Sequence, residues 1–350
     1  MAKQPEPEPP PKVTKTRVTF IAVGDIMMSR GVAKKIFAAK DPLLPFSKFA
    51  ERLKSTDFNF ANLESPFSGS DKVASSGSLV FNTPDNFVTG LKEYNFKVIT
   101  LANNHALDQG FKGVKYTRQH LTDNELIVTG TGEDLTQAWQ PAFIKVKGVK
   151  IAFIGSSYAS INDGGIARND YVARIEDTDS LKKSIETAKK EADFVIATMH
   201  AGIEDTYKPH KPQEDFAHTA IDLGADLVIG HHPHWIQTVE KYKERYIFYS
   251  LGNFIFDQRN PNNKEGLTLK ITLQNTKTET KKNTKSETII EEIELIPVVI
   301  ENFSTPREAK EEEAKKILAK IDISERFIKH MSEEKVKSED SKQSIKSIHQ

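Results

Sequence analysis

Side chains that could bind a metal ion or move a proton follow five apolar runs of this sequence, at the points where the runs end. Apolar runs of this kind predict buried strands, and the loops at the carboxyl ends of such strands line the functional crevice of open α/β sheets. The sequence therefore predicts one site assembled from distant segments. The five groups are Asp25; Asn62 and Glu64; Asn103, Asn104, His105 and Asp108; His200; and His231, His232 and His234.

The most informative group is the segment 230–234, which reads GHHPH. Three imidazoles within four residues would repel one another if they were protonated, and one rigid proline separates His232 from His234. This spacing favours two ligands that converge on one metal site. Each other group taken alone also fits a structural role, as a turn at Asp25 or Asn103, a helix cap at Glu64 or a packed histidine at His200. Their joint occurrence favours the metal site.

Residues 101–110, LANNHALDQG, place a carboxamide, an imidazole and a carboxylate close together after an apolar run. Carboxylate and carboxamide oxygens and imidazole nitrogens are ligands of hard or borderline divalent metals. Two such ions ~3.5–4 Å apart activate a water and hold a phosphoryl or similar group. We expect Asn104 to be a ligand, His105 to be the acid that protonates the leaving oxygen, and Asp108 to orient His105.

The composition narrows the classes of function. The chain of 350 residues has no cysteine, which excludes disulfides and thiolate metal sites. Lys+Arg and Asp+Glu both number 49, so charge balance gives no indication of a nucleic-acid ligand. Hydrophobic residues make up 37% of the chain, enough for a large core. No apolar run approaches the ~20 residues that a membrane helix needs.

The elements that position these groups alternate between strands and helices, which predicts an α/β fold. A hairpin that turns near Lys243 and Glu244 is expected over residues 237–254, and a polar loop tip is expected over 274–287 between strands near 266–274 and 287–300. The other expected strands are 17–23, 57–64, 96–103, 125–132, two strands within 141–157, 193–200 and 226–234, and the expected helices are 45–54, 84–94, 113–122, 180–191 and 212–223.

Composition also predicts three parts along the chain. Residues 1–16 form a proline-rich extended spacer, residues 17–303 the folded domain, and residues 304–350 a charged tail. The tail is expected to begin a polar helix with a capping box at Thr305 to Glu308 and to be disordered from about 332. The spacer has two interpretations: it separates the domain from an anchor or signal upstream of Met1, or it is an ordinary frayed terminus.

Six ordered segments resemble a known family, over about residues 17–300. They are VGDIMMSRGV, NLESPFS, LANNHALDQG, TMHAGIE, IGHHPHWIQ and YSLGNFIFDQ, and they closely resemble the CapA proteins of bacterial poly-γ-glutamate capsule synthesis. The resemblance implies a fold similar to that of the calcineurin-like metallophosphoesterases, a four-layer α/β/β/α sandwich with a dinuclear metal centre. The two stacked sheets are implied by the resemblance alone.

The resemblance also implies roles for individual residues. Met27 stands where the phosphoesterase pattern has a histidine, which leaves open whether one or two divalent ions bind, whether they are Mn, Zn or Fe, and whether the site is active. The pattern does not decide between His231 and His232 as the first ligand of its segment. The implied metal ligands are Asp25, Glu64 as the bridging residue, Asn104, His200, His232 and His234, with His105 as the acid.

The segment SLGNFIFDQ is less easily assigned. It fits a strand that ends in a Gly-Asn turn, and it also fits a contact with the substrate. Residues 162–170 are expected to form a flexible loop that covers the crevice. The further candidates for metal or substrate contact are Asn62, His231, Asn253 and Asp257.

Three functions remain in view. The first is a metal-dependent hydrolase that acts on a phosphoester or on an amide-like bond of an anionic polymer. The second is a non-catalytic, membrane-associated subunit at the cell surface that works with other capsule-synthesis subunits in the synthesis, export or attachment of such a polymer. The third is a binding domain whose histidines pack internally and hold no metal.

Overall fold

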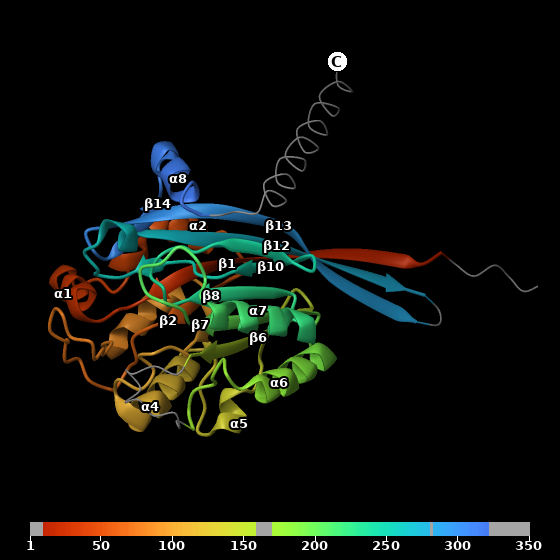
Figure 1. Ribbon diagram of the computed structural model, residues 1–350, viewed down its shortest axis with the longest axis horizontal. Helices are drawn as coiled ribbons and strands as arrows, with labels where there is room; N and C mark the ends of the chain where they lie inside the picture. The colour runs from red at the N-terminus through yellow and green to blue at the C-terminus, as the bar shows by residue number, and fades with distance from the viewer. Residues whose placement is uncertain (1–9, 159–169, 281–282, 322–350) are drawn as a thin grey trace, which may run out of the picture.

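Two β-sheets packed face to face, with helices on both outer sides, form the protein (Figure 1). The computed structural model describes residues 10–158, 170–280 and 283–321. Within those ranges, no helix is both long enough and apolar enough to cross a lipid bilayer.

Among the described residues, the larger sheet has eight strands in the order β14-β13-β12-β1-β2-β3-β4, with β11 paired to β1. Strands β1 to β4 run parallel, and β12 to β14 run antiparallel beside them. The carboxyl ends of β1, β2 and β3 therefore lie at one edge of the sheet. The bounds are β1 Lys12–Ile26, β2 Phe58–Leu63, β3 Phe96–Thr100, β4 Ile127–Thr129, β11 Asn253–Ile255, β12 Glu265–Glu279, β13 Thr284–Glu301 and β14 Thr305–Glu308.

In the part of the chain that the structure describes, the smaller sheet has six strands in the order β5-β6-β7-β8-β10-β9. Strands β6, β7, β8 and β10 are parallel to one another, so the ends of β7 and β8 also meet at one edge. The bounds are β5 Ala142–Val146, β6 Val149–Ser157, β7 Phe194–His200, β8 Leu227–His231, β9 Val239–Tyr242 and β10 Arg245–Phe248.

Aromatic side chains fill the space between the two sheets. Alternate residues of β1, such as Phe20, face the other sheet, whereas Ile21 faces the helices, as the two-residue period of a strand requires. Phe20 stacks on Phe58 within the larger sheet, with ring centroids 4.9 Å apart, and Phe60 stacks across the interface on Phe153 at 5.0 Å. This buried layer fixes how the strand ends of one sheet face those of the other.

Helices cover the outer face of each sheet and complete the four layers. Against the larger sheet pack α1 Arg30–Ala39, η1 Leu44–Phe49, α2 Ala50–Lys54, η2 Asp85–Phe87, α3 Val88–Glu93 and α4 Gly110–Asp123. Against the smaller sheet pack α5 Leu135–Ala138, α6 Thr178–Glu191 and α7 Lys211–Leu223. Short helices η4 Pro261–Lys264 and α8 Glu311–Leu318 follow later in the chain. The expected four-layer α/β/β/α arrangement is confirmed.

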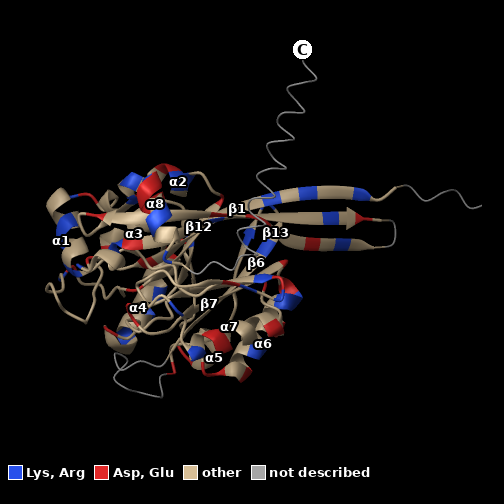
Figure 2. Ribbon diagram, turned by 45° about the horizontal axis from the view of Figure 1, so that its top comes forward, with Lys and Arg blue, Asp and Glu red and all other residues tan. Residues whose placement is uncertain are grey.

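The polar segment 274–287 is not the expected loop tip, because most of it belongs to the long hairpin of β12 and β13. With the start of β1, these strands form a three-stranded ribbon that projects from the body (Figure 1), with charged residues of both signs along it (Figure 2). Threonine is frequent in this segment, and its β-branched side chain favours extended backbone even where neither face is apolar.

The two expected boundaries of the folded domain also differ from those observed. Strand β1 begins at Lys12, five residues before the expected start at residue 17, because pairing with β12 extends it into the ribbon. Thr305–Glu308 does not begin a helix but forms β14, which pairs with β13, and α8 begins at Glu311. The loop expected to cover the crevice lies almost wholly outside the described residues, and the disordered end expected from about 332 lies wholly outside them.

Candidate metal centre

The strand ends of both sheets contribute to one buried cluster of oxygen and nitrogen donors. His200 ends β7 of the smaller sheet, and its Nε2 lies 2.8 Å from Oδ1 of Asn104, which follows β3 of the larger sheet. In the same way, the backbone N–H of His232, just after β8, donates to Oδ2 of Asp25 at the end of β1, at 3.2 Å. The structure thus brings together the distant segments that the sequence grouped.

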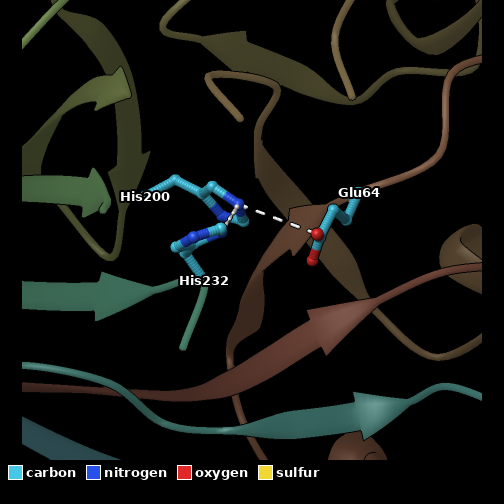
Figure 3. A group of neighbouring side chains, drawn as sticks. All are labelled: Glu64, His200 and His232. Carbon is cyan, nitrogen blue, oxygen red and sulfur yellow. Dashed lines mark hydrogen bonds and ion pairs between the residues drawn. The ribbon is translucent and has the colours of Figure 1, made fainter. Parts of the chain in front are cut away.

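The first group of donors surrounds Nε2 of His200. This nitrogen lies 2.8 Å from Asn104 Oδ1, 3.2 Å from His232 Nδ1 and 3.7 Å from Glu64 Oε1. Figure 3 shows the two imidazoles and the carboxylate directed toward one another from three separate segments. All four side chains are buried, so the group is shielded from bulk water.

The second group contains Asp25, Glu64 and His234, whose ligand atoms lie within 4.8 Å of one another. Nδ1 of His234 is 3.6 Å from Asp25 Oδ2 and 3.0 Å from Oδ1 of Asn253. Glu64 belongs to both groups, which is the position that a carboxylate bridging two cations would occupy.

Glu64 gives the clearest indication of a cation. Both of its carboxylate oxygens are buried, and neither has a hydrogen-bond partner among the described residues. Burial, together with repulsion from the Asp25 charge, raises the pKa of Glu64 well above its usual value. A buried, unpaired carboxylate is costly, and a divalent ion between its oxygens and the neighbouring imidazoles would remove that cost. The donor set, oxygen and imidazole nitrogen only, suits a hard or borderline divalent metal.

The pKa shifts of the two histidines in the first group favour cation binding. Burial lowers the pKa of His232 to about 3 and the pKa of His200 well below its usual value, so both rings are neutral and can offer a lone pair. In the second group, burial opposes the charged forms, but the close approach of Asp25 and His234 lowers the pKa of the carboxyl and raises the pKa of the imidazole.

His105 lies at the side of the centre, with its ring oriented by a carboxylate. Its Nδ1 is 2.8 Å from Asp108 Oδ2, which also accepts the backbone N–H of Phe81 at 2.6 Å. Nε2, at the other side of the ring, lies 3.9 Å from Glu64 Oε1. The ring of Phe81 stacks on His105 with centroids 3.9 Å apart. Asp108 and Phe81 therefore hold the imidazole with Nε2 on the Glu64 side.

Two other residues that the sequence analysis names, Asn62 and Asn103, position the donors through hydrogen bonds. The amide of Asn62 donates to Asp25 Oδ1 at 2.8 Å and lies 3.2 Å from His200 Nδ1, so it orients one member of each group. Asn103 in turn donates to Asn62 Oδ1 at 3.1 Å. Asn62 therefore positions two donors, and Asn103 positions Asn62.

The three histidines of the segment 230–234 lie in three different surroundings. His231 Nε2 contacts the backbone oxygen of Val23 at 3.2 Å and lies outside both groups, whereas His232 lies in the first group and His234 in the second. His232 and His234 both have positive φ angles, 100° and 58°, a strained conformation for residues other than glycine. This turn directs the two side chains into the cluster.

Two positions lie apart from the donor groups. Met27 is buried in the core under α1 and its Sδ accepts the backbone N–H of Ser29, so it offers no ligand. Asp257, a candidate for metal or substrate contact, instead pairs with the guanidinium of Arg30 and accepts the N–H of Gly31 at 2.9 Å. Its carboxylate is thereby already neutralised.

Arg30 is a charged residue near the centre that the sequence analysis missed, and it contacts two missed aromatic residues, Phe81 and Phe256. Its guanidinium lies over the rings of Phe81 and Phe256, 4.7 Å and 5.6 Å from their centroids. Phe81 stacks on His105, and Phe256 contacts His234 with centroids 4.8 Å apart. The available signal was its place in the segment VGDIMMSRGV, which also contains Asp25.

Comparison with known proteins supports the resemblance seen in the sequence. The family model described as "Bacterial capsule synthesis protein PGA_cap" matches residues 19–258. A capsule biosynthesis protein CapA of Bacillus anthracis is 34% identical over 270 residues, which cover 75% of this chain and 65% of that protein. A PGA biosynthesis protein CapA of Bacillus subtilis (strain 168) is 34% identical over 238 residues, 67% of this chain and 62% of that protein.

Solved structures similar to this chain are more distant. The NAD nucleotidase of Haemophilus influenzae has 13% sequence identity and a TM-score of 0.42, and the match covers 93% of this chain and 60% of that chain. A 5'-nucleotidase precursor from Thermus thermophilus has 13% identity and a TM-score of 0.39, over 79% of this chain and 54% of that chain.

This chain matches only part of each of the two Bacillus relatives. The chain spans just under two thirds of the length of each, 65% and 62%. The family model, in contrast, matches more than half of this chain, from the first strand of the folded body to the segment that contains Asn253 and Asp257. The chain therefore belongs to the PGA_cap family of bacterial capsule synthesis proteins.

Proposed function

We propose that this protein is a metal-dependent hydrolase of capsule biosynthesis that acts on a phosphoester or on an amide-like bond of an anionic polymer such as poly-γ-glutamate. Membership of the capsule synthesis family and the names of the CapA relatives support the biological role. The observation that carries the chemical part is Glu64, a buried carboxylate without a hydrogen-bond partner among the described residues that two groups of metal-binding side chains share.

Each of the two donor groups would hold one metal ion. Glu64 with His200, His232 and Asn104 would hold one divalent ion, and Glu64 with Asp25 and His234 a second. When bound, such ions activate a water and polarise a phosphoryl or carbonyl oxygen. Asn62 keeps Asp25 and His200 in place through its amide group. The oxygen and imidazole donors suit Mn, Zn or Fe.

His105 is the proposed general acid. Asp108 binds Nδ1, so Nε2 is the nitrogen that can carry a proton toward a leaving oxygen on the Glu64 side of the ring. Phe81 covers one face of the imidazole and limits its contact with water on that face. This arrangement separates the residue that moves the proton from the residues that hold metal.

The test combines metal analysis with hydrolysis assays on bis(p-nitrophenyl) phosphate and poly-γ-glutamate. We expect the His105→Ala variant to retain its metal content and to lose ~10²–10⁴-fold in hydrolysis rate, the usual range for a general acid. His200→Ala should lose metal as well as activity. His120→Ala, on α4 and outside both donor groups, is the matched control and should behave like the wild type. Equal rates for His105→Ala and wild type would remove His105 from the mechanism.

A second function, that of a non-catalytic cell-surface subunit, is favoured by one observation. Met27 is buried in the core and leaves the second donor group with fewer ligands than the phosphoesterase pattern implies. In this proposal the protein is membrane-anchored outside the cytoplasm and assists synthesis, export or attachment of the polymer. Restoration of capsule in a deletion strain by His105→Ala as fully as by wild type would support this function over the hydrolase.

A further inference from the structure

The two donor groups differ in their number of ligands. The first has four side chains, because Asn104 adds a carboxamide oxygen to Glu64, His200 and His232. The second has Asp25, Glu64 and His234, and Met27, two residues after Asp25, is packed in the core. A divalent ion bound there would be one protein ligand short.

We propose that Asn253 supplies the missing ligand, through its side-chain oxygen Oδ1. This inference rests on the metal centre of the proposed function. Asn253 is fully buried, and its Oδ1 lies 3.0 Å from His234 Nδ1, which in turn lies 3.6 Å from Asp25 Oδ2. The carboxamide oxygen thus contacts one donor of the group that lacks a ligand, and that donor lies close to a second.

Strand pairing places Asn253 beside Asp25. Strand β11 runs parallel to β1 in a register that sets Asn253 opposite Asp25, and the N–H of Asp25 donates to the oxygen of Gly252 at 2.9 Å. The strands approach closely, because a Cβ on Gly24 would lie 2.0 Å from that same oxygen. The absence of a side chain at Gly24 therefore allows the two segments to approach each other.

Hydrogen bonds fix which end of the Asn253 amide faces the donors. Its Nδ2 donates to the backbone oxygen of Asn263 at 2.9 Å and to Gln258 Oε1 at 2.7 Å. A backbone oxygen can only accept, so the nitrogen must point there and the oxygen must point toward His234. Trp235 fixes the orientation of the side-chain amide of Asn263 in the same way, since its indole N–H donates to Asn263 Oδ1 at 2.7 Å.

The pair formed by Asn253 and His234 repeats the pair formed by Asn104 and His200. In each, a carboxamide oxygen lies close to a ring nitrogen, at 3.0 Å and 2.8 Å respectively. Such an oxygen and a lone pair of a ring nitrogen repel unless a proton or a cation lies between them. The alternative to coordination is a positioning role, in which Asn253 only accepts the Nδ1–H of His234.

A cysteine at position 253 separates these two roles, because the chain has no other thiol. In the Asn253→Cys variant loaded with Co²⁺, a thiolate that binds the metal adds a sulfur-to-cobalt charge-transfer band in the near ultraviolet. We expect that band in Asn253→Cys and not in the matched variant Asn263→Cys, because Asn263 contacts Asn253 through its backbone oxygen while its side chain binds Trp235 and Asp205. Absence of the band in a folded Asn253→Cys would overturn the ligand role.

Metal stoichiometry provides a second measurement that does not depend on the cysteine variant. Calorimetric titration with Co²⁺ should give two equivalents for wild type and for Asn253→Asp, which keeps an oxygen donor. Asn253→Leu should lose the second equivalent or bind it at least 10-fold more weakly. Two equivalents of unchanged affinity in Asn253→Leu would overturn the inference, whereas a wild type that binds no metal would overturn the proposed function itself.

Discussion

At the scale of single residues, Glu64 connects function with a loss of stability. Its two buried oxygens have no hydrogen-bond partner among the described residues, whereas the other donors contact one another. Natural proteins retain such an unfavourable group where an activity requires it. The metal-free protein should therefore be less stable with glutamate at this position than with a neutral residue of the same shape.

We predict that Glu64→Gln raises the melting temperature of the metal-free protein and abolishes metal binding. Burial raises the pKa of Glu64, so the folded state loses stability relative to the unfolded state as pH rises above the ordinary pKa of the residue, by up to ~1.4 kcal/mol per pH unit. The difference between the variant and wild type should thus be small at pH 5 and larger at pH 7. Calorimetry in the presence of a chelator measures it.

The control for this prediction is Glu51→Gln, at an exposed position on α2, which should change the melting temperature little at either pH. A Glu64→Gln variant that is less stable than wild type at both values of pH would show that the carboxylate is stabilising without metal, contrary to the prediction.

At the scale of elements, the centre depends on how closely β1 and β11 approach. Most donors lie in segments that directly follow strands, so small shifts in strand pairing move them. Gly24 is the point of closest approach, since any Cβ there would meet Gly252. The turn that carries His232 and His234 adds local strain, because both residues have positive φ angles.

We predict that Gly24→Ala weakens metal binding and lowers the free energy of unfolding by several kcal/mol, because the new methyl group forces β11 away from β1. Gly77→Ala is a control that isolates the conformational effect. Gly77 has a φ angle of 93° but no neighbour within 4 Å, so only strain of about 1 kcal/mol is expected. Urea unfolding and metal titration measure the two effects. Equal losses in the two variants would contradict the role of close strand approach.

At the scale of the whole molecule, the candidate metal centre takes its donors from both sheets. Asp25, Glu64 and Asn104 come from strand ends of the larger sheet, whereas His200 and His232 come from strand ends of the smaller one. Bound metal would therefore add a link between two layers that already contact each other through aromatic packing and polar contacts.

We predict that Zn²⁺ raises the melting temperature of wild type and slows hydrogen exchange at the ends of strands in both sheets. A ligand at 100 times its dissociation constant stabilises the folded state by about 2.7 kcal/mol. His200→Ala should show neither effect, and His120→Ala should show both. Protection confined to one sheet would mean that the ion does not link them.

The sequence by itself determined the alternation of strands and helices and the grouping of donors at strand ends. Local period and turn residues encode these features: Phe20 and Ile21 face opposite sides of β1 because of the two-residue period, and Asp25 follows directly where the apolar run ends. The stacking of two sheets came only from the family resemblance, because no local pattern specifies which faces meet. The polar composition of residues 274–287 also led to a wrong prediction of a loop tip, because most of this segment pairs as strands β12 and β13.

Only the tertiary structure decided which donors share a group. His231 and His232 are neighbours in sequence, yet one contacts a backbone oxygen in the core and the other meets His200, because a strand alternates its sides and the following turn is strained. Asp257 and Asn253 lie four residues apart, and one pairs with Arg30 whereas the other faces His234. The contacts of His231 with Val23 and of Asp257 with Arg30 join segments more than 200 residues apart, and spacing along the chain does not specify such contacts.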